Sequence, residues 1–244
     1  MAVSCGYHTC VMEIKGKTAV ITGATGKLAA AIVLAMAKAG ANCICIYNKN
    51  AAKAKKLKAD LRKLKTKNLF IQADLTAPAD IEKVFAEIKK FAAPAILINA
   101  AAVFDKKLIK DISCEHIKET FDINFSAAIL MTKEFVKLAG KKKRLKIINI
   151  TDAITQKHPA GFSVYSASKA ALESATRTLA KELAPNITVN AIAPGIVHKP
   201  KKITAKIATD KTAGIKRVLN AVKFLIENDD VTGQIINVDG DRKL

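Results

Sequence analysis

The sequence predicts an α/β protein in which a seven-stranded, mostly parallel sheet carries helices on both faces. Short runs rich in Ile and Val alternate with longer helical patterns, an order that is typical of βαβ units. The strand runs are continuously apolar, as expected for strands that are covered on both sides. No Pro- or Gly-rich linker divides the 244 residues. We therefore predict a single doubly wound domain at residues 12–244, preceded by a loose extension at residues 1–11.

Each predicted element has its own local signal. The strand candidates share β-branched, apolar composition and are Thr18–Thr22, Asn42–Tyr47, Leu69–Gln72, Ala95–Asn99, Leu145–Ile150, Ile187–Ile192 and Gln234–Val238. The helical patterns between them lie at 27–39, 51–65, 78–91, 113–139, 163–184 and 213–227. The most basic of these, 51–65, places Leu57, Leu61 and Leu64 at core spacing, which predicts an amphipathic helix with a solvated lysine face.

Composition excludes several classes of protein. Half of the residues are hydrophobic and a quarter are charged, a mix that excludes disorder, collagen and coiled coil as the main architecture. The longest apolar run, Leu28–Ala37, has ten residues and is too short to cross a bilayer. The first residues do not resemble a signal peptide. We therefore expect a cytoplasmic protein with no membrane partner.

The chain is strongly basic, with 41 Lys and Arg against 21 Asp and Glu, a formal net charge of +20. Such a charge favours anionic ligands or partners, but a solvated, lysine-rich surface is the simpler interpretation. Basic residues are not interleaved with aromatic ones as in binders of single-stranded nucleic acid. We expect no nucleic-acid partner.

The cysteines and histidines do not form a metal-binding pattern. The five cysteines are odd in number, so a disulfide framework is not expected. Cys43 and Cys45 lie in an apolar strand run and are predicted core residues. Cys5, His8 and Cys10 have no second ligand pair, and the remaining histidines, expected in loops or on the surface, are His116, His158 and His198. We predict no metal site.

A glycine-containing loop follows the first predicted strand and opens the first helix. It runs from Thr22 to Ala29, and its candidate cofactor-binding residues are Gly23, Thr25, Gly26, Lys27 and Leu28. Glycines allow a ligand to approach the backbone, and a helix N-terminus offers free N–H groups to a pyrophosphate. This pattern predicts a dinucleotide site of the Rossmann type; a purely structural turn is the alternative.

The second strand ends in a cationic rather than an acidic sequence. Folds that prefer NAD usually place a carboxylate there for the ribose hydroxyls, whereas this chain has Asn48 and Lys49. Lys49 could pair with a 2′-phosphate, so we predict NADPH, unless this lysine is only a solvated one. After the third strand, Asp74 could accept hydrogen bonds from the adenine amino group, with Leu75 beside it; a turn or cap is the alternative role.

The predicted chemistry depends on Tyr165 and Lys169, which are four residues apart at a helix start and therefore share a helix face. A nearby ammonium lowers the pKa of a phenol and makes it a usable acid or base. This spacing arises often by chance, so the pair needs further support.

Taken together, these motifs resemble the short-chain dehydrogenase/reductase family over residues 12–242. The matching pieces are Thr22–Ala29, Ala73–Leu75, Ile98–Ala101, Asn124, the pair Tyr165 and Lys169, Pro194–Gly195 and Val231–Gln234. The resemblance implies that Asn99, Ala100, Ala101, Pro194 and Gly195 also contact the cofactor. It further implies that Lys169 binds the nicotinamide ribose and that Asn124 holds a water leading from Lys169 to solvent.

One departure from the common family pattern points to a particular branch. Most members have a serine thirteen residues before the tyrosine, and this chain has Asp152 there, as the pteridine and bacterial dihydromonapterin reductases do; a strand-end cap is the alternative role of this aspartate. Lys27 and the ending Val238–Arg242 are also similar to that branch. By the same resemblance, Phe104 would stack on a pterin ring beside Ala102, and Asp152 with Tyr165 would supply a proton to a C=N nitrogen. An ionised Asp152 opposes the effect of the lysine on Tyr165, so we expect the pair to titrate as a unit.

Other expectations follow from the resemblance. Ala29 stands where most relatives have a third loop glycine, and Ala100 where an asparagine is usual; both changes predict weak NADPH affinity. The segment 197–213 would close over the substrate or form a simple surface loop. We expect a homotetramer that packs through the helices near 113–139 and 163–184.

Three functions remain open at the level of sequence. The first is NADPH-dependent reduction of a dihydropterin or a dihydrofolate-type substrate. The second is carbonyl reduction, for example of 3-oxoacyl groups on an acidic carrier protein, which Asp152 disfavours. The third is a non-catalytic NADPH sensor or scaffold, suggested by Ala29 and Ala100.

Overall fold

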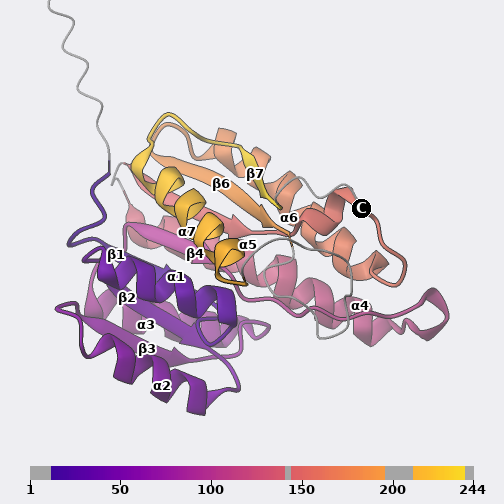
Figure 1. Ribbon diagram of the computed structural model, residues 1–244, viewed down its shortest axis with the longest axis horizontal. Coiled ribbons are helices and arrows are strands. Elements are labelled where there is room, and N and C mark those ends of the chain that lie inside the picture. Colours follow the sequence, from indigo (N-terminus) through magenta and orange to yellow (C-terminus); the bar gives the residue numbers. More distant parts are fainter. Residues whose placement is uncertain (1–11, 141–143, 196–210, 240–244) are drawn as a thin grey trace, which may run out of the picture.

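A computed structural model describes residues 12–140, 144–195 and 211–239 as a single layered α/β unit (Figure 1). The predicted extension at residues 1–11, most of the segment 197–213 and the last residues from 240 lie outside the described part. The sheet contains seven parallel strands in the order β3-β2-β1-β4-β5-β6-β7. The predicted fold class is confirmed.

The strands agree closely with the predicted runs and are β1 (Thr18–Ile21), β2 (Asn42–Tyr47), β3 (Asn68–Gln72), β4 (Ile96–Asn99), β5 (Leu145–Ile150), β6 (Ile187–Pro194) and β7 (Ile235–Val238). The helices are α1 (Lys27–Lys38), α2 (Ala51–Leu61), α3 (Pro78–Phe91), α4 (Cys114–Phe121), α5 (Ala127–Ala139), α6 (Ser163–Glu182) and α7 (Lys211–Glu227), with short 3₁₀ turns η1 (Ile109–Asp111) and η3 (Ala153–Gln156).

Two apolar cores lie on opposite faces of the sheet, because successive strand side chains point to opposite sides. On the face toward the viewer in Figure 1, α1, α2 and α7 cover Ala19 and Ile21 of β1 together with Cys43 and Cys45 of β2. On the far face, α3, α5 and α6 cover residues such as Val20 of β1. Both cysteines are fully buried and free, as predicted, and burial raises the pKa of the Cys43 thiol to about 12.

The helical pattern predicted at 113–139 is not one helix. A π-helical segment, η2 (Asp122–Ser126), separates α4 from α5. One extra residue in a turn leaves the apolar pattern nearly continuous while it rotates the helix that follows. The segment packs against α6 and buries Asn124, so the irregular turn lies where the predicted site is.

His116 corrects another expectation. It lies in α4 and is 8% exposed, with its Nδ1 3.7 Å from Oδ2 of Asp105. The sequence predicts a loop or surface position for His116, because nothing in the local sequence shows that Asp105, in the loop after β4, lies beside it. His158, in contrast, is exposed in the turn after η3.

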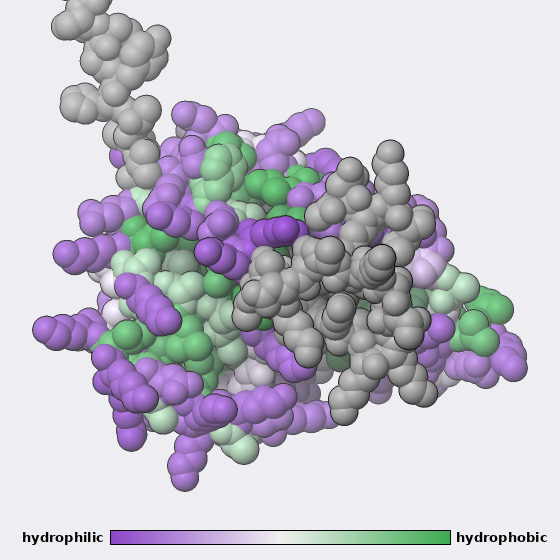
Figure 2. All heavy atoms as spheres, in the orientation of Figure 1, coloured by the Kyte–Doolittle hydropathy of each residue, from purple (hydrophilic) through white to green (hydrophobic). Residues whose placement is uncertain are grey.

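Hydrophilic and hydrophobic side chains are unevenly distributed over the face seen in Figure 2. Figure 2 shows hydrophilic side chains around the rim of this face, with a hydrophobic area over α1 and another at the end of the loop before α4. In that loop Leu108 and Ile109 are 48% and 82% exposed. Among the described residues, no helix is both long and apolar enough to span a membrane.

Candidate active site

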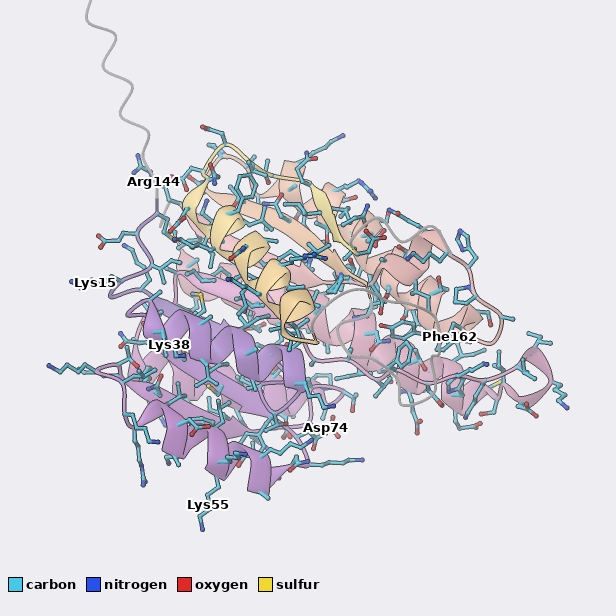
Figure 3. All side chains as sticks on the ribbon, in the orientation of Figure 1. Lys15, Lys38, Lys55, Asp74, Arg144 and Phe162 are labelled. Carbon is cyan, nitrogen blue, oxygen red and sulfur yellow. The ribbon has the colours of Figure 1, made fainter. Side chains whose placement is uncertain are left out.

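The candidate site lies at the edge of the sheet where the strands end, between β1 and β4. The strand order reverses there, and such a switch point is where open α/β sheets bind ligands. Figure 3 shows Asp74 and Phe162 toward this edge, whereas Lys15 and Arg144 lie at the opposite one. Lys15 and Arg144 precede β1 and β5, while Asp74 follows β3, so the view agrees with the strand directions.

The loop after β1 packs tightly on the loop after β4. The Thr22 hydroxyl oxygen accepts hydrogen bonds from the amides of Ala100 and Ala101 at 2.9 and 3.0 Å. Gly23 has a φ of +64°, and a Cβ there would lie 2.7 Å from the Cα of Ala101. Only glycine combines this backbone conformation with so close an approach. The predicted cofactor loop is therefore held against Ala100 and Ala101.

The N-terminus of α1 fits an anionic group. Gly26 precedes the helix in an extended conformation, and no described side chain caps the first turn. Its first amides are thus available to a ligand, and they carry the positive end of the helix dipole. Lys27 is exposed in the same turn and Thr25 lies just before it. These groups match the needs of a pyrophosphate.

Ala29 and Leu28 pack toward the protein interior. Ala29 is 3% exposed within the core between α1 and the sheet, and Leu28 packs against the same cluster. The extra methyl of Ala29 therefore occupies core space, which removes the reason to expect that it hinders a ligand at the loop.

Asn48, Lys49 and Asp74 come together at the ends of β2 and β3. Asp74 Oδ1 accepts hydrogen bonds from the amide and hydroxyl of Thr76 at 3.0 and 2.8 Å. These two bonds, then the Asn48 side chain and the charge of Lys49, hold the pKa of the Asp74 carboxyl below its usual value. Asp74 is thus a turn residue that remains ionised beside exposed polar groups, while the neighbouring Leu75 side chain is buried.

Asp152 and Tyr165 are in direct contact. The Tyr165 hydroxyl donates to Asp152 Oδ2 at 2.8 Å, and Asp152 Oδ1 accepts from the amide of Ile154 at 2.9 Å. Asp152 ends the loop after β5 and caps η3, while Tyr165 lies in the first turn of α6. The carboxylate therefore serves as a helix cap with one oxygen and meets the phenol with the other.

Burial dominates the acid–base properties of this pair. Desolvation raises the pKa of the Asp152 carboxyl, although the Ile154 amide, the Tyr165 hydroxyl and the nearby lysines act in the opposite direction. Desolvation, followed by the charge and hydrogen bond of Asp152, also raises the pKa of the Tyr165 phenol. The expected lowering of the Tyr165 pKa by Lys169 does not prevail, because burial of the phenol and then the nearby carboxylate of Asp152 favour its protonated form.

Lys169 lies beneath this pair, with its Nζ 6.0 Å from the centre of the Tyr165 ring. The ammonium donates to the carbonyl of Ile150 at 2.9 Å. Burial lowers the pKa of Lys169 to about 8, against the opposing charges of Asp152 and Glu173. Asp152, Tyr165 and Lys169 are thus three ionisable groups that influence one another, one more than the pair expected to titrate as a unit.

Asn124 connects the π segment to the loop after β4. Its side-chain oxygen accepts from the amide of Val103 at 2.9 Å, and its Nδ2 donates to the carbonyl of Val103 at 3.2 Å and to Ser168 Oγ at 3.0 Å. Asn124 thus fixes the backbone of Val103, the residue before Phe104, by two hydrogen bonds. The irregular turn of η2 gives it this position.

An aromatic cluster forms one side of the site. Phe104 is 64% exposed, stacks on Phe162 at 5.0 Å and meets Tyr165 edge-on at 4.8 Å between ring centres. Ala102 is exposed in the same stretch of chain. Phe162 is not among the predicted site residues, although its place three residues before Tyr165 is a usable signal. The exposed ring of Phe104 offers a flat apolar surface to a ligand.

Asn99 is directed inward rather than toward the cleft. Its Nδ2 donates to Asn149 Oδ1 at 2.9 Å, and Asn149 in turn donates to Thr176 Oγ1 at 2.9 Å. This buried polar chain connects β4, β5 and α6 below the site. Any contact of Asn99 with a cofactor must therefore come from its backbone.

The ends of β6 and β7 lie side by side at the same edge of the sheet. Gly195 donates its amide to the carbonyl of Val238 at 3.1 Å, and a Cβ on Gly195 would lie 2.7 Å from Asp239 Cβ. Asp239 Oδ2 lies 3.6 Å from the Nζ of Lys157. Pro194 ends β6 at this point. Among the described residues, no group of His, Cys, Asp or Glu could hold a metal ion.

Comparison with known proteins identifies relatives of this chain. A family model described as short chain dehydrogenase matches residues 17–212. An NADPH-dependent aldehyde reductase-like protein from the chloroplast of Arabidopsis thaliana is 31% identical, covering 94% of this chain and 95% of its own. A 3-oxoacyl-acyl-carrier-protein reductase from Buchnera aphidicola is 32% identical, with coverage of 94% and 98%.

Solved structures show the same architecture. A short chain dehydrogenase from Burkholderia cenocepacia in complex with NADP is similar with a TM-score of 0.82 and 26% identity, covering 94% of this chain and 98% of its own. A blue fluorescent protein from a metagenomic library, in complex with NADPH, is similar with a TM-score of 0.83, 25% identity and coverage of 96% and 100%.

Proposed function

This chain belongs to the short-chain dehydrogenase family and is an oxidoreductase, and we propose that it reduces a C=N bond of a pterin, such as a dihydropterin or dihydrofolate, with NADPH. The observation that carries the proposal is the 2.8 Å contact between Tyr165 and Asp152 beside the exposed ring of Phe104. A carboxyl and a phenol can together hold a proton for a ring nitrogen, whereas the family's usual serine hydroxyl suits a carbonyl oxygen.

NADPH fits the groups around the cleft. The amides at the start of α1 and the side chain of Lys27 suit its pyrophosphate, and Lys49 suits a 2′-phosphate. Gly23 and Gly195 let Ala101 and Asp239 approach closely, which holds the loops around the proposed cofactor position in place. Similar structures in complex with NADP and NADPH support the same cofactor. When bound, this cofactor supplies hydride.

The protein's own residues would then manage the proton and the orientation of the substrate. Phe104 would hold a flat bicyclic ring, with Phe162 behind it. Asp152 has a raised pKa and hydrogen-bonds the phenol of Tyr165, so the pair can store one proton in the cleft and release it to a substrate nitrogen. Lys169 would bind the ribose, and its charge would balance the carboxylate.

We further propose that the protein is a homotetramer and that it works in the cytoplasm. A groove of about 420 Å³ between the π segment and α6 is lined by apolar and small side chains: Phe125, Ile129, Ala171, Ser174, Ala175, Thr178 and Leu179. Small residues allow helices of two subunits to approach closely, which supports a homotetramer packed through these helices. Free buried Cys43 and Cys45 are consistent with a reducing, cytoplasmic setting.

A second candidate is carbonyl reduction, favoured by the relatives named as 3-oxoacyl-acyl-carrier-protein reductases. The net charge of +20 would suit an acidic carrier protein. The third candidate, a non-catalytic NADPH-binding protein, is disfavoured by the contact between Asp152 and Tyr165. It predicts NADPH binding without turnover of any substrate.

Substrate panels with NADPH and NADH distinguish these functions. We expect NADPH-dependent turnover of dihydrobiopterin, dihydromonapterin or dihydrofolate, and a loss of about 10²-fold or more in kcat for Tyr165→Phe and Asp152→Asn. The control, Glu182→Gln, alters an exposed carboxylate at the far end of α6 and should keep full activity. Turnover of simple ketones alone, retained or increased in Asp152→Ser, would establish carbonyl reduction instead.

A further inference from the structure

Glu173 is a buried carboxylate that the proposed reaction does not use. It lies on α6, four residues after Lys169 and eight after Tyr165, so the three side chains share one face of the helix. Glu173 is only 9% exposed. Because an ionisable group in such a place is costly unless it is paired and hydrogen-bonded, its partners indicate what it does.

Thr155 connects Glu173 to the turn that carries Asp152. The Thr155 Oγ1 lies 3.0 Å from Glu173 Oε1 and 3.0 Å from the carbonyl oxygen of Asp152. Thr155 belongs to η3, which Asp152 caps. The side chain of Glu173 therefore reaches from α6 to the short helix whose geometry sets the direction of the Asp152 carboxylate.

Glu173 also acts on the charge of Lys169. That ammonium is fully enclosed, and the two carboxylates that favour its protonated form are Asp152 and Glu173. In the proposed reaction Asp152 exchanges its proton, so its charge varies. Glu173 is the carboxylate that can keep the ammonium compensated while Asp152 is neutral.

We propose that Glu173 is a positioning residue of this site, which holds the Asp152 turn through Thr155 and balances the buried ammonium of Lys169 with its charge. The two parts of this role depend on different atoms. The hydrogen bond requires an oxygen acceptor at the end of the side chain, whereas the balance requires a negative charge. Substitutions can therefore separate them.

Other charged groups around Lys169 have partners of their own. Lys157, near Asp152, lies 3.6 Å from Asp239. On the elements that pack against α6, His116 of α4 lies near Asp105, and Asp122 of the π segment pairs with Lys118. Arg177, one turn beyond Glu173, is exposed. Tyr165 shares the site and favours its protonated form.

The charge role can be tested without substrate or cofactor, by NMR of the full chain labelled at the lysine side chains. The titration of Lys169 is identified by its absence in Lys169→Arg. Glu173→Gln keeps an acceptor for Thr155 but removes the charge, so we expect the Lys169 midpoint to fall by about half a pH unit or more. Thr155→Val keeps the charge of Glu173 and should move the Lys169 midpoint less than Glu173→Gln does. Glu182→Gln, which neutralises an exposed carboxylate on the same helix, should leave the midpoint unchanged. An unchanged midpoint in folded Glu173→Gln would overturn the charge role.

The positioning role is tested by kinetics, and this part rests on the proposed function. Thr155→Val should lower kcat several-fold with little change in the KM for NADPH, because only the proton-donating pair is displaced. Glu173→Gln should move the alkaline limb of the kcat/KM profile to lower pH. A kcat of Thr155→Val equal to that of the unmodified protein would overturn the positioning of Asp152 through Thr155.

The test also covers a Glu173→Gln variant that does not fold and a protein that turns over no substrate. If Glu173→Gln does not fold, Glu173→Asp keeps the charge but shortens the reach to Thr155, so the Lys169 midpoint should stay and kcat should fall. A shifted Lys169 midpoint together with an unchanged kcat in Glu173→Asp would overturn the proposal. If no substrate is turned over but the midpoint still falls in Glu173→Gln, the proposed function fails while the effect of Glu173 on Lys169 stands.

Discussion

Asp152 and Tyr165 show how burial governs acid–base chemistry at the scale of single residues. Removing a carboxylate from water is costly, and here one of its oxygens is compensated by the Ile154 amide and the other by the phenol. Both groups are consequently most stable with a proton between them. A pair of this kind is suited to donating a proton to a substrate rather than to keeping a free phenolate.

Lys169 gives a testable dependence of stability on pH. Its pKa is about 8 in the folded protein against a reference value of 10.5, so between these values the unfolded chain binds more protons than the folded one. The free energy of unfolding should therefore rise with pH in this window, by up to about 1.4 kcal/mol per pH unit from this group. Lys169→Met should remove that rise in urea unfolding between pH 8 and about 10.

The matched control for this experiment is Lys181→Met, which replaces an exposed lysine near the end of α6. It should keep the pH dependence of the unmodified protein. Equal slopes for the unmodified protein and Lys169→Met would contradict the assignment of a lowered pKa to Lys169.

At the scale of elements, the site depends on where regular structure starts and stops. α1 begins at a glycine without a side-chain cap, which leaves its amides to a ligand. The π segment between α4 and α5 places Asn124 against both the loop after β4 and α6. In the first case the helix leaves its amides free for a ligand, and in the second the irregular turn directs Asn124 to partners on both the loop after β4 and α6.

Helix α1 supports a prediction about the missing third glycine. Ala29 packs in the core, so Ala29→Gly should lower the free energy of unfolding by about 1–2 kcal/mol through lost helix propensity and a lost buried methyl. The dissociation constant for NADPH, measured by fluorescence titration, should stay within about twofold.

Ala31→Gly is the control, because Ala31 lies in the same helix but is only half-buried. It should lose about 1 kcal/mol from helix propensity alone. If Ala29→Gly instead tightened NADPH binding many-fold, the methyl group would have to limit the approach of the cofactor after all.

At the scale of the whole molecule, a buried ion pair connects the sheet to α7 at the end opposite the site. Lys146 of β5 is 1% exposed, and its Nζ lies 2.6 Å from Asp229 Oδ1 and 2.8 Å from the carbonyl of Asn228. Asp229 follows α7, so the pair fixes the far end of that helix on β5. A lysine in the middle of a parallel sheet is tolerated because this end of α7 provides its partners.

Breaking this pair should be far more damaging than breaking an exposed one. Asp229→Ala leaves a buried ammonium without its carboxylate, and we expect a loss of about 3 kcal/mol in the free energy of unfolding. Glu87→Gln, which breaks the exposed pair between Glu87 and Lys90, should cost less than about 1 kcal/mol. Similar losses for both variants in urea unfolding would show that the Lys146 pair is solvated.

The sequence by itself determined the layered fold, the strand positions and the identities of most candidate site residues. Apolar strand runs and helical periodicity are local properties, so they can be identified without knowledge of the partners. The loop Thr22–Ala29 and the spacing of Tyr165 and Lys169 likewise carry their meaning in a few adjacent residues.

The tertiary structure alone decided which of these side chains meet and in what protonation state. The link from Glu173 to Thr155, the stacking of Phe162 on Phe104, the inward direction of Asn99 and the core position of Ala29 all depend on contacts between distant segments. The same holds for Tyr165, since desolvation and the distance to Asp152 set its pKa, and neither can be derived from spacing along the chain.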